Sequence, residues 1–403
     1  MHFFVFTLYF VSFVTVTDGF YENPTLYVPE WNDFLDHQSL LLTDLFRDYD
    51  GTVSPIYTKR DLSKPNGYNP LAPDRWNYTV FLYYMKLVEV VEPEEKVTVV
   101  FEMAEYWHDP RLAWDPNKYG NITMLHMRQD KIWSPTLSSF GINDIVDFRD
   151  QDFRLVCVES TGHVYDSLSA RISVNCRMKV GRFPFDSQTC TVQFCLPIFN
   201  EKLVKIDSLI YPGILNKTLW EAMGNSEWDL INLTNRIDTL AFNDNFGGME
   251  LATFEIKIRR NPMYYIYMIV FPSYIINVLS IIGVFMKKSD KMSQLNVGLT
   301  NIMTMTFILG VMSDKIPKTG NIPLLGIYII INLFIMITAV GLTIGIGELR
   351  KWAIPKLKGK ERKMSKSLEF LLGDVLETIL VIAMEILTTA NFLLMIGYWI
   401  TDG

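Results

Sequence analysis

The chain has 403 residues, of which 49% are hydrophobic and 20% are charged, and its formal net charge is -7. This length is enough for two ordinary domains. The acidic balance argues against nucleic acid as a partner, which requires a basic surface. No phosphate-binding loop, dinucleotide turn or nucleophile motif is present, so we expect neither an enzyme nor a cofactor. The five His residues show no ligand-like spacing, so we expect no metal site.

The N-terminus begins with an apolar run over residues 2–16, which ends near Asp18. The run is too short to cross a bilayer comfortably, and its position is typical of a secretory signal peptide over residues 1–18. A buried N-terminal strand is the alternative, because the run carries no Lys or Arg. Residues 20–36 are loop-like, and the apolar spacing over His37–Asp50 predicts one short helix.

From about Asn77 to Arg260 the chain consists of short segments rich in Val, Ile, Thr and aromatic residues. Turn residues such as Pro93-Glu94-Glu95 and Gly247-Gly248 separate many of them. Many short strands at this spacing are typical of an antiparallel β-sandwich. We therefore predict a ligand-binding sandwich domain over residues 19–260.

N-glycosylation sequons occur only before residue 260, which agrees with an extracellular location for that part of the chain. We expect sugar attachment at the Asn of each sequon: Asn77, Asn121, Asn216 and Asn232.

The composition becomes strongly apolar after Pro262. Four segments are each close to the roughly 20 residues that a helix needs to cross ~30 Å of hydrocarbon. These predicted spans are residues 264–286, 293–312, 322–346 and 375–400. Buried helices of a soluble core are the alternative.

Basic residues set the predicted topology. The first connection between spans contains Lys287, Lys288 and Lys291, and the third, over residues 347–374, is rich in Lys and Arg. Both are therefore predicted to be cytoplasmic by the positive-inside rule. Residues 261–403 would form a transmembrane domain whose third connection is a short cytoplasmic loop, with the N-terminus outside the cell.

Cys176 and Cys190 enclose thirteen residues, among them Phe183-Pro184-Phe185-Asp186. This segment resembles the signature loop of the Cys-loop receptors, which are pentameric ligand-gated ion channels. The resemblance extends over roughly residues 36–400. It is carried further by WHDPRLAWDP from Trp107 to Pro116, by Trp133-Ser134-Pro135, by Arg259–Tyr265, and by Thr304-Met305-Thr306 with Pro317.

The resemblance implies a Cys176–Cys190 disulfide at the base of the sandwich, with the enclosed loop resting on the membrane helices. It also implies that certain residues couple ligand binding to the pore: Phe183, Pro184, Phe185, Asp186, Arg260 and Pro317. The alternatives are a disulfide that only stabilises the domain and an Arg260 that is only a charged flank of the membrane, although carboxylates are expected opposite it. Cys157 and Cys195 remain, and a second disulfide between them is left open because leftover cysteines tend to pair outside the cell.

The second apolar segment carries a stripe of residues at three- and four-residue steps, which share one helical face. The stripe runs from polar through apolar to acidic: Asn296, Thr300, Met303, Phe307, Val311 and Asp314. The resemblance implies that it lines the pore, with Met303 and Phe307 gating by dewetting. The alternative is a helix that packs its polar residues against neighbouring helices.

The sequence indicates the charge of the permeant ion only indirectly. Ser293 and Gln294 stand where cation channels of the family carry a Glu and anion channels a Pro-Ala-Arg pattern. Asp290-Lys291-Met292 resembles the cation motif but falls about one helical turn too early. A ring of Asp314 carboxylates favours cations, and the cytoplasmic Lys and Arg residues favour anions. On balance we favour cations.

Transmitters of the family bind in aromatic boxes at subunit interfaces, where rings attract an ammonium group. Phe140 aligns with one box position, but Pro197 stands where acetylcholine receptors carry Trp. Phe199, Phe242 and Phe246 are the other candidates, and the loop before the last strand has no vicinal cysteine pair. We therefore do not expect acetylcholine. Either the ligand differs, or this subunit supplies the opposite face of another subunit's site.

The sequence thus predicts an α+β membrane protein, with an N-terminal helix and an extracellular antiparallel β-sandwich followed by a four-helix transmembrane bundle. The implied function is that of a neurotransmitter-gated channel subunit in the plasma membrane, including that of synapses. Its expected partners are related subunits of a homo- or heteropentamer, a small-molecule transmitter and membrane lipid. A non-conducting accessory or assembly subunit of a heteropentamer is the alternative.

Overall fold

The computed structural model describes residues 28–402, apart from residues 57, 61–67, 71–74, 242–246, 287–289, 319 and 358–374. The predicted signal peptide over residues 1–18 lies outside the described residues. The chain divides into two units. The first unit comprises residues 1–55, 108–134 and 155–164, and the second comprises residues 56–107, 135–154 and 165–403.

The first unit contains helix α1 and a strand pair. Helix α1 spans Val28–Leu45 and therefore begins and ends earlier than the predicted helix over His37–Asp50. The early start includes Pro29, which is tolerated in a first helical turn because the missing N–H has no intrahelical partner there. Strand β5 (Met124–Arg128) pairs antiparallel with β8 (Leu155–Glu159). Short 3₁₀ helices complete the unit: η2 (Pro110–Leu112), η3 (Pro116–Lys118) and η4 (Gln129–Lys131).

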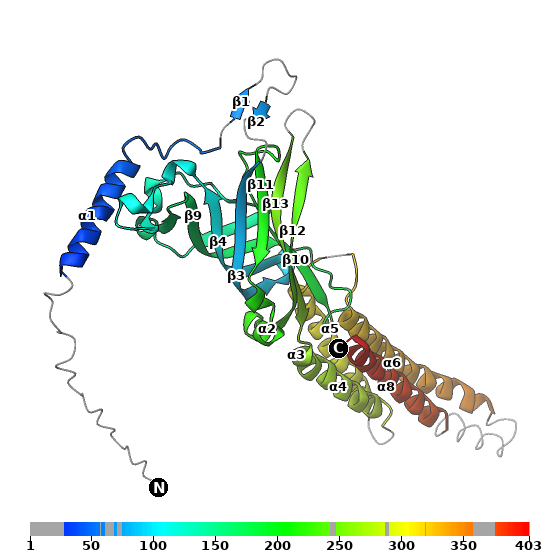
Figure 1. The fold of residues 1–403 in the computed structure, drawn as a ribbon. Coiled ribbons are helices and arrows are strands. Elements are labelled where there is room, and N and C mark those ends of the chain that lie inside the picture. Colours follow the sequence, from blue (N-terminus) through cyan, green and yellow to red (C-terminus); the bar gives the residue numbers. More distant parts are fainter. Residues whose placement is uncertain are drawn as a thin grey trace, which may run out of the picture. The chain divides into compact units, whose positions relative to one another are not determined.

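The second unit contains a β-sandwich, as predicted (Figure 1). In one sheet β11, β3, β4 and β9 are neighbours and β7 pairs with β9, whereas the other sheet has the order β12-β13-β10-β6. The strands of the first sheet are β3 (Trp76–Val91), β4 (Lys96–His108), β7 (Ile142–Asp147), β9 (His163–Asn175) and β11 (Val204–Ile210). Those of the second are β6 (Ser138–Phe140), β10 (Ser187–Cys195), β12 (Trp228–Ala241) and β13 (Gly248–Arg260).

Aromatic rings from both sheets meet in the sandwich core. Phe101 of β4 lies with its ring centroid 6.2 Å from Phe194 of β10 and 5.9 Å from Phe254 of β13. All three side chains are buried. Alternation of buried and exposed residues along β10 and β13 brings these rings to one face, as expected for strands that cover a core.

One strand pairing differs from the expectation, and one strand is irregular. Strand β11 pairs with β3 in parallel, whereas an antiparallel sandwich was predicted. Strand β12 continues to Ala241 and contains a β-bulge between Leu230 and Asn232, where its register with β13 shifts. Trp228 and Leu230 are buried before the bulge and Leu233 after it, so the extra residue changes which positions point inward.

Shorter elements connect the strands of the second unit. They are the hairpin of β1 (Thr58–Arg60) and β2 (Tyr68–Pro70), the 3₁₀ helices η1 (Glu92–Glu94), η5 (Gln151–Phe153) and η6 (Pro212–Leu215), and helix α2 (Lys217–Met223).

Within the described part of the chain, four helical segments are long and apolar enough to cross a membrane: Met263–Val284, Lys291–Lys315, Leu324–Leu349 and Leu376–Tyr398. They run side by side in Figure 1. The first is built from α3 (Met263–Tyr265), the π-helical turn η7 (Ile266–Val270) and α4 (Phe271–Val284). The others belong to α5 (Lys291–Lys315), α6 (Leu324–Leu357) and α8 (Leu376–Asp402).

Buried amides tie these helices together. Asn301 of α5 donates to Asn277 of α4 at 3.0 Å, and Asn391 of α8 donates to Asn332 of α6 at 2.9 Å. Such hydrogen bonds between side chains hold membrane helices together where no water competes for the polar groups. At Gly298 of α5 an added Cβ would collide with the side chain of Val340, so a glycine is needed for this close approach.

Candidate functional site

A disulfide closes the loop at residues 176–190, called here the Cys loop. Cys176 and Cys190 are bonded, with their Cα atoms 5.2 Å apart. Inside the loop, Gln188 accepts from the backbone N–H of Lys179 at 2.8 Å and donates to the Lys179 carbonyl at 3.2 Å. The predicted disulfide is thus present, and the loop has internal hydrogen bonds that fix its shape.

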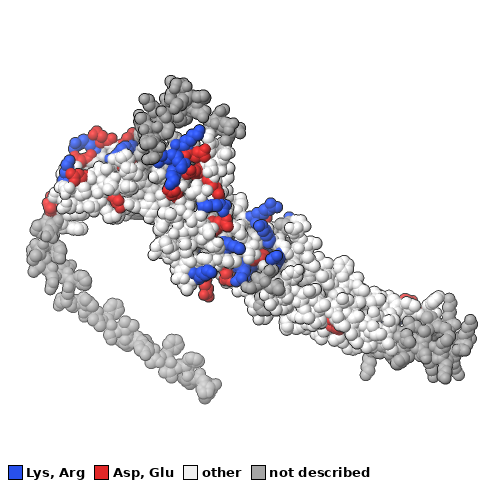
Figure 2. Space-filling view, turned by 45° about the vertical axis from the view of Figure 1, so that its right-hand side comes forward, with Lys and Arg blue, Asp and Glu red and all other residues white. Residues whose placement is uncertain are grey.

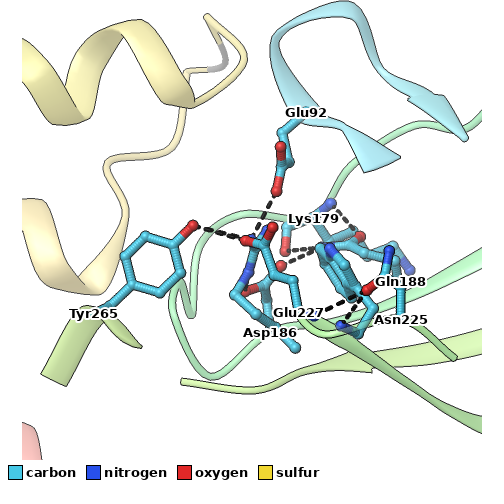
Figure 3. Close-up of polar contacts among 9 residues, drawn as sticks. Glu92, Lys179, Asp186, Gln188, Asn225, Glu227 and Tyr265 are labelled. Carbon is cyan, nitrogen blue, oxygen red and sulfur yellow. Dashed lines mark hydrogen bonds and ion pairs between the residues drawn. The ribbon is translucent and has the colours of Figure 1, made fainter. Parts of the chain in front are cut away.

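Arg260, the last residue of β13, is the centre of a buried ion cluster. Its side chain is fully buried. Its Nε lies 2.9 Å from Asp186 Oδ1, and its Nη1 lies 2.7 Å from Glu92 Oε1 and 2.5 Å from Glu227 Oε1. Tyr265 donates its hydroxyl to the same Glu227 oxygen at 2.8 Å. Figure 3 shows Glu92, Asp186, Glu227 and Tyr265 converging from separate segments of the chain.

Aromatic rings surround the same guanidinium. The Arg260 Cζ lies 4.1 Å from the ring centroid of Trp228, 4.8 Å from that of Phe183 and 5.6 Å from that of Tyr265. Arg260 Nη2 has no hydrogen-bond partner among the described residues. The cation–π attraction of the rings helps to offset the lost hydration of that group.

The electrostatics of the cluster favour the charged form of Arg260. Burial by itself would lower the pKa of Arg260, but the charges of Asp186 and Glu92, with the hydrogen bond to Asp186, raise it above its ordinary value. Removing one partner of a buried ion pair strands the others and typically costs about 3–5 kcal/mol. The members of this cluster therefore depend on one another.

The Cys loop touches the membrane helices directly. The backbone N–H of Leu324, the first residue of α6, donates to the Gly181 carbonyl at 3.0 Å, and that of Leu325 donates to the Phe183 carbonyl at 3.1 Å. The turn η1, which supplies Glu92, contacts α5. One cluster therefore connects the Cys loop, β13, the start of the first span and the neighbourhoods of α5 and α6.

The structure brings together most of the predicted coupling residues. Phe183, Asp186 and Arg260 are in contact. Pro184 is buried and Phe185 half-buried in the same loop. Pro317 is buried just beyond the end of α5. The backbone hydrogen bonds to the loop come from Leu324 and Leu325, which were not singled out from the sequence.

The predicted pore stripe lies on the free face of α5. All six stripe residues are exposed, with Met303 at 69% and Phe307 at 72%. The buried residues of the same helix are Gly298, Asn301, Met305 and Met312. The alternative prediction, that α5 packs polar residues against its neighbours, describes Asn301 but none of the stripe residues.

Among the candidate ligand residues that the structure describes, Phe140 and Phe199 are the aromatic ones. Phe140 is exposed on β6 and lies opposite Gln193 of β10 in the strand register. Pro197 is exposed and Phe199 half-buried in the turn that follows β10. Phe242 and Phe246 lie outside the described residues, so the part of the chain that the structure describes contributes no ring from that loop.

The second candidate disulfide is absent. Cys157 and Cys195 are both free. Cys157 is half-buried on β8, whereas Cys195 is buried at the end of β10 and packs against Met249 and Leu251. Cys195 therefore acts as a small apolar core residue, which is a common role for a buried thiol. The four sequon asparagines are all exposed.

A comparison with protein families identifies the fold and the Cys loop together. Residues 38–262 match the family model described as the neurotransmitter-gated ion-channel ligand binding domain. The chain belongs to the neurotransmitter-gated ion-channel family. The resemblance to Cys-loop receptors is thereby confirmed, and the family consists of ion channels rather than enzymes.

Individual relatives in this ion-channel family are distant. Over 76% of the present chain, the sequence is 27% identical to the acetylcholine receptor subunit beta-type acr-2 of Caenorhabditis elegans. Over 75% of the present chain, it is 27% identical to the neuronal acetylcholine receptor subunit beta-3 of Rattus norvegicus. It is 24% identical to the 5-hydroxytryptamine receptor 3A of Cavia porcellus over 76%. The matches span only 50%, 60% and 59% of these relatives, respectively.

Several members of the Arg260 cluster were not predicted from the sequence. Glu92, Glu227, Trp228 and Tyr265 come from a strand turn, the start of β12 and the first membrane helix. Sequence reasoning placed unnamed carboxylates opposite Arg260. No local signal marked these residues, because the pairing of Trp228 with Arg260 in the register of β12 and β13 is seen only in the structure.

Proposed function

We propose that this chain is a subunit of a pentameric neurotransmitter-gated channel whose pore is lined by α5. The single observation that carries the proposal is the division of α5 into two faces. Met305 is fully buried against the chain's own helices, whereas Met303, two residues earlier, is largely exposed. A helix with a polar-to-apolar stripe on its free face is suited to surround a water-filled path when copies assemble in a ring.

Coupling between ligand and pore would pass through the Arg260 cluster. A transmitter bound between outer domains favours one of two global states, and an element in contact with both parts transmits that preference. The cluster meets this requirement because it joins β13 and the Cys loop to the start of the first span. The roles of Phe183, Pro184, Phe185, Asp186, Arg260 and Pro317 in gating are part of this proposal.

We favour permeation by cations. Asp314 is exposed near the C-terminal end of α5, where copies in a ring would place several carboxylates around one mouth of the pore. The exposed neighbour Lys315 acts in the opposite direction. Reversal potentials measured while Na⁺ and Cl⁻ are replaced in turn would decide between the two charges.

The transmitter is proposed to be a small molecule that is not held by a complete aromatic box. Relatives are named for acetylcholine and 5-hydroxytryptamine. In this chain Pro197 is followed by Ile198, which is 79% exposed, so neither of these two residues supplies a ring to that part of the face. The site is accordingly expected to discriminate against quaternary ammonium ligands, which depend on several rings. The working location is the plasma membrane, including synapses, with the sandwich outside.

Cysteine labelling tests the pore assignment without a known transmitter. In a Cys157→Ser background, Val311→Cys and Asp314→Cys, which lie on the outer side of the proposed gate at Met303 and Phe307, are expressed in intact cells and exposed to a charged, membrane-impermeant maleimide. Both are expected to be labelled, whereas the matched control Met312→Cys on the same helix is expected to resist because that position is buried. Equal labelling at position 312, or none at positions 311 and 314, would contradict a water-lined stripe.

A second candidate is a subunit that assembles with related chains but does not conduct alone. The exposed Phe140 and Pro197, with no box around them in the described residues, favour it. Co-expression with related subunits separates the two candidates. Met303→Ser alters the partners' current if this chain lines their pore, and leaves it unchanged if the chain acts only in assembly.

A further inference from the structure

The Cys loop carries basic residues on one side only. Met178 and Val180 are buried, whereas the alternating residues Arg177 and Lys179 are exposed, as is Arg182. This alternation directs apolar side chains into the sandwich and positive charges away from it. These exposed charges differ from the buried charge of Arg260, although Asp186 of the Arg260 cluster lies in the same loop.

A hollow of about 680 Å³ lies beside these basic residues. Its wall includes the Cys-loop residues Arg177, Lys179, Arg182 and Ser187, and Gly320 and Asn321 of the connection between α5 and α6. Asp186 also borders the hollow, but its two oxygens accept from Arg260 and from Gln188. The carboxylate is thereby committed to other partners, and the wall of the hollow is positive.

The hollow lies at the height of a membrane surface. Gly181, which lines it, accepts the backbone hydrogen bond of Leu324, and Leu324 begins the apolar span of α6. Figure 2 shows Lys and Arg side chains gathered where the sandwich meets the nearly uncharged helical part. Polar lipid headgroups occupy the layer directly outside the hydrocarbon core.

We propose that this hollow binds the phosphate of a membrane phospholipid headgroup, held by Arg177, Lys179 and Arg182. Guanidinium groups match phosphate oxygens with paired hydrogen bonds, and a lysine ammonium adds a compact charge. A lipid is favoured over free phosphate because its acyl chains can lie along the adjacent apolar start of α6. A phosphate bound here contacts both the Cys loop and the α5–α6 connection, so it stabilises their present arrangement.

Lipid binding by the full-length chain in neutral detergent tests this proposal. The chain is titrated with short-chain phosphatidylglycerol, and binding is followed by native mass spectrometry. Each basic side chain near an anionic lipid contributes about a fivefold factor in affinity, so Arg177→Gln/Lys179→Gln/Arg182→Gln is expected to bind about a hundredfold more weakly. The control Lys131→Gln/Arg171→Gln/Lys202→Gln removes the same charge outside the hollow and is expected to bind like the wild type.

Several outcomes would overturn the proposal. Unchanged binding by the first triple variant, or equal weakening in the control, excludes a specific site. Glycerol phosphate that competes at the concentration of the lipid shows a phosphate site without lipid preference. A changed oligomeric state with unchanged lipid binding shows a contact between subunits instead. If the triple variant fails to fold, Lys179→Gln alone is used, with an expected loss of about fivefold, and no loss then refutes the site.

Discussion

The base of the sandwich and the face around Phe140 differ in how strongly each residue depends on its neighbours. At the base, the fully buried Arg260 contacts Glu92, Asp186 and Glu227 and is surrounded by aromatic rings. On the other face, Phe140 is about half exposed and Pro197 is exposed after the end of β10.

The difference shows where physical constraint is concentrated in this chain. A buried charge is tolerated only with a nearly complete set of partners, so each residue of the cluster limits its neighbours. An exposed ring stays in contact with water whatever its neighbours are, so it places no such limit on them. Substitutions at the base should therefore affect folding, whereas those at the exposed face should affect ligand recognition alone.

The largest effect is expected for Arg260→Gln, which leaves three carboxylates without their shared cation. The free energy of unfolding should fall by about 3–5 kcal/mol. Chemical denaturation of the purified chain in detergent measures it. Arg259→Gln, the exposed neighbour on the same strand, is the matched control and should change stability by less than about 1 kcal/mol. Similar losses of stability in Arg260→Gln and Arg259→Gln would contradict the prediction that burial of the charge sets the cost of removing it.

A somewhat smaller effect is expected for Cys176→Ser/Cys190→Ser. Opening a loop of this size increases the entropy of the unfolded chain, and the expected loss of stability is about 3 kcal/mol. Denaturation with and without reductant measures it. Cys157→Ser, which removes a free thiol, serves as control. A wild type whose stability does not respond to reductant would contradict the prediction.

Glu105 tests whether a buried charge outside the base behaves in the same way. Burial raises the pKa of Glu105 to about 7, although the hydrogen bond from Tyr78 at 2.5 Å opposes this shift. The folded state thus binds the proton more tightly than the unfolded state, whose pKa is near 4.5. The stability contribution of Glu105 should therefore be greatest below pH 4.5 and be lost as pH rises to about 7, by an amount on the order of 3 kcal/mol.

The measurement compares unfolding of the wild type and Glu105→Gln across that pH range. The variant keeps an acceptor for Tyr78 but cannot ionise, so its advantage over the wild type should grow with pH. Glu102→Gln, three residues earlier on β4, is the control. Parallel pH curves for wild type and Glu105→Gln would contradict the buried-carboxyl interpretation.

The smallest effect on folding is expected for Phe140→Ala. An exposed side chain contributes little to packing, so stability should change by less than about 0.5 kcal/mol. The apparent affinity for an activating transmitter should nevertheless fall. Denaturation and dose–response curves from the same variant measure the two quantities. A destabilised variant with normal responses would reverse the comparison between base and face.

The long-period features of the fold were predictable from the sequence. Strands β3, β4, β9 and β13 and the apolar helices follow patterns that extend over many residues. Strand β6 has only three residues, too few for a recognisable period, and the parallel pairing of β11 depends on tertiary contacts. The start of α1 was missed because residues 20–36 were taken as loop-like.

The same distinction applies to the site. The motif around Phe183 and Asp186 is contiguous in sequence, so the Cys loop was recognisable. Glu92 and Glu227 lie on different connections, and nothing local marks either one as a partner of Arg260. Asn301 lies inside a predicted helix, but only the packed structure shows its bond to Asn277.

The bulge in β12 accommodates one extra residue between the buried positions Leu230 and Leu233. Residues at intervals of two would otherwise share a side, so Asn232 would point inward with Trp228 and Leu230. With the additional residue Ile231, Asn232 faces outward and is accessible to an oligosaccharide-transferring enzyme. Regular pairing over the same residues would turn that amide into the apolar interior and expose Leu233, so the two-to-one pairing at the bulge is what keeps the sequon on the solvent side of the strand.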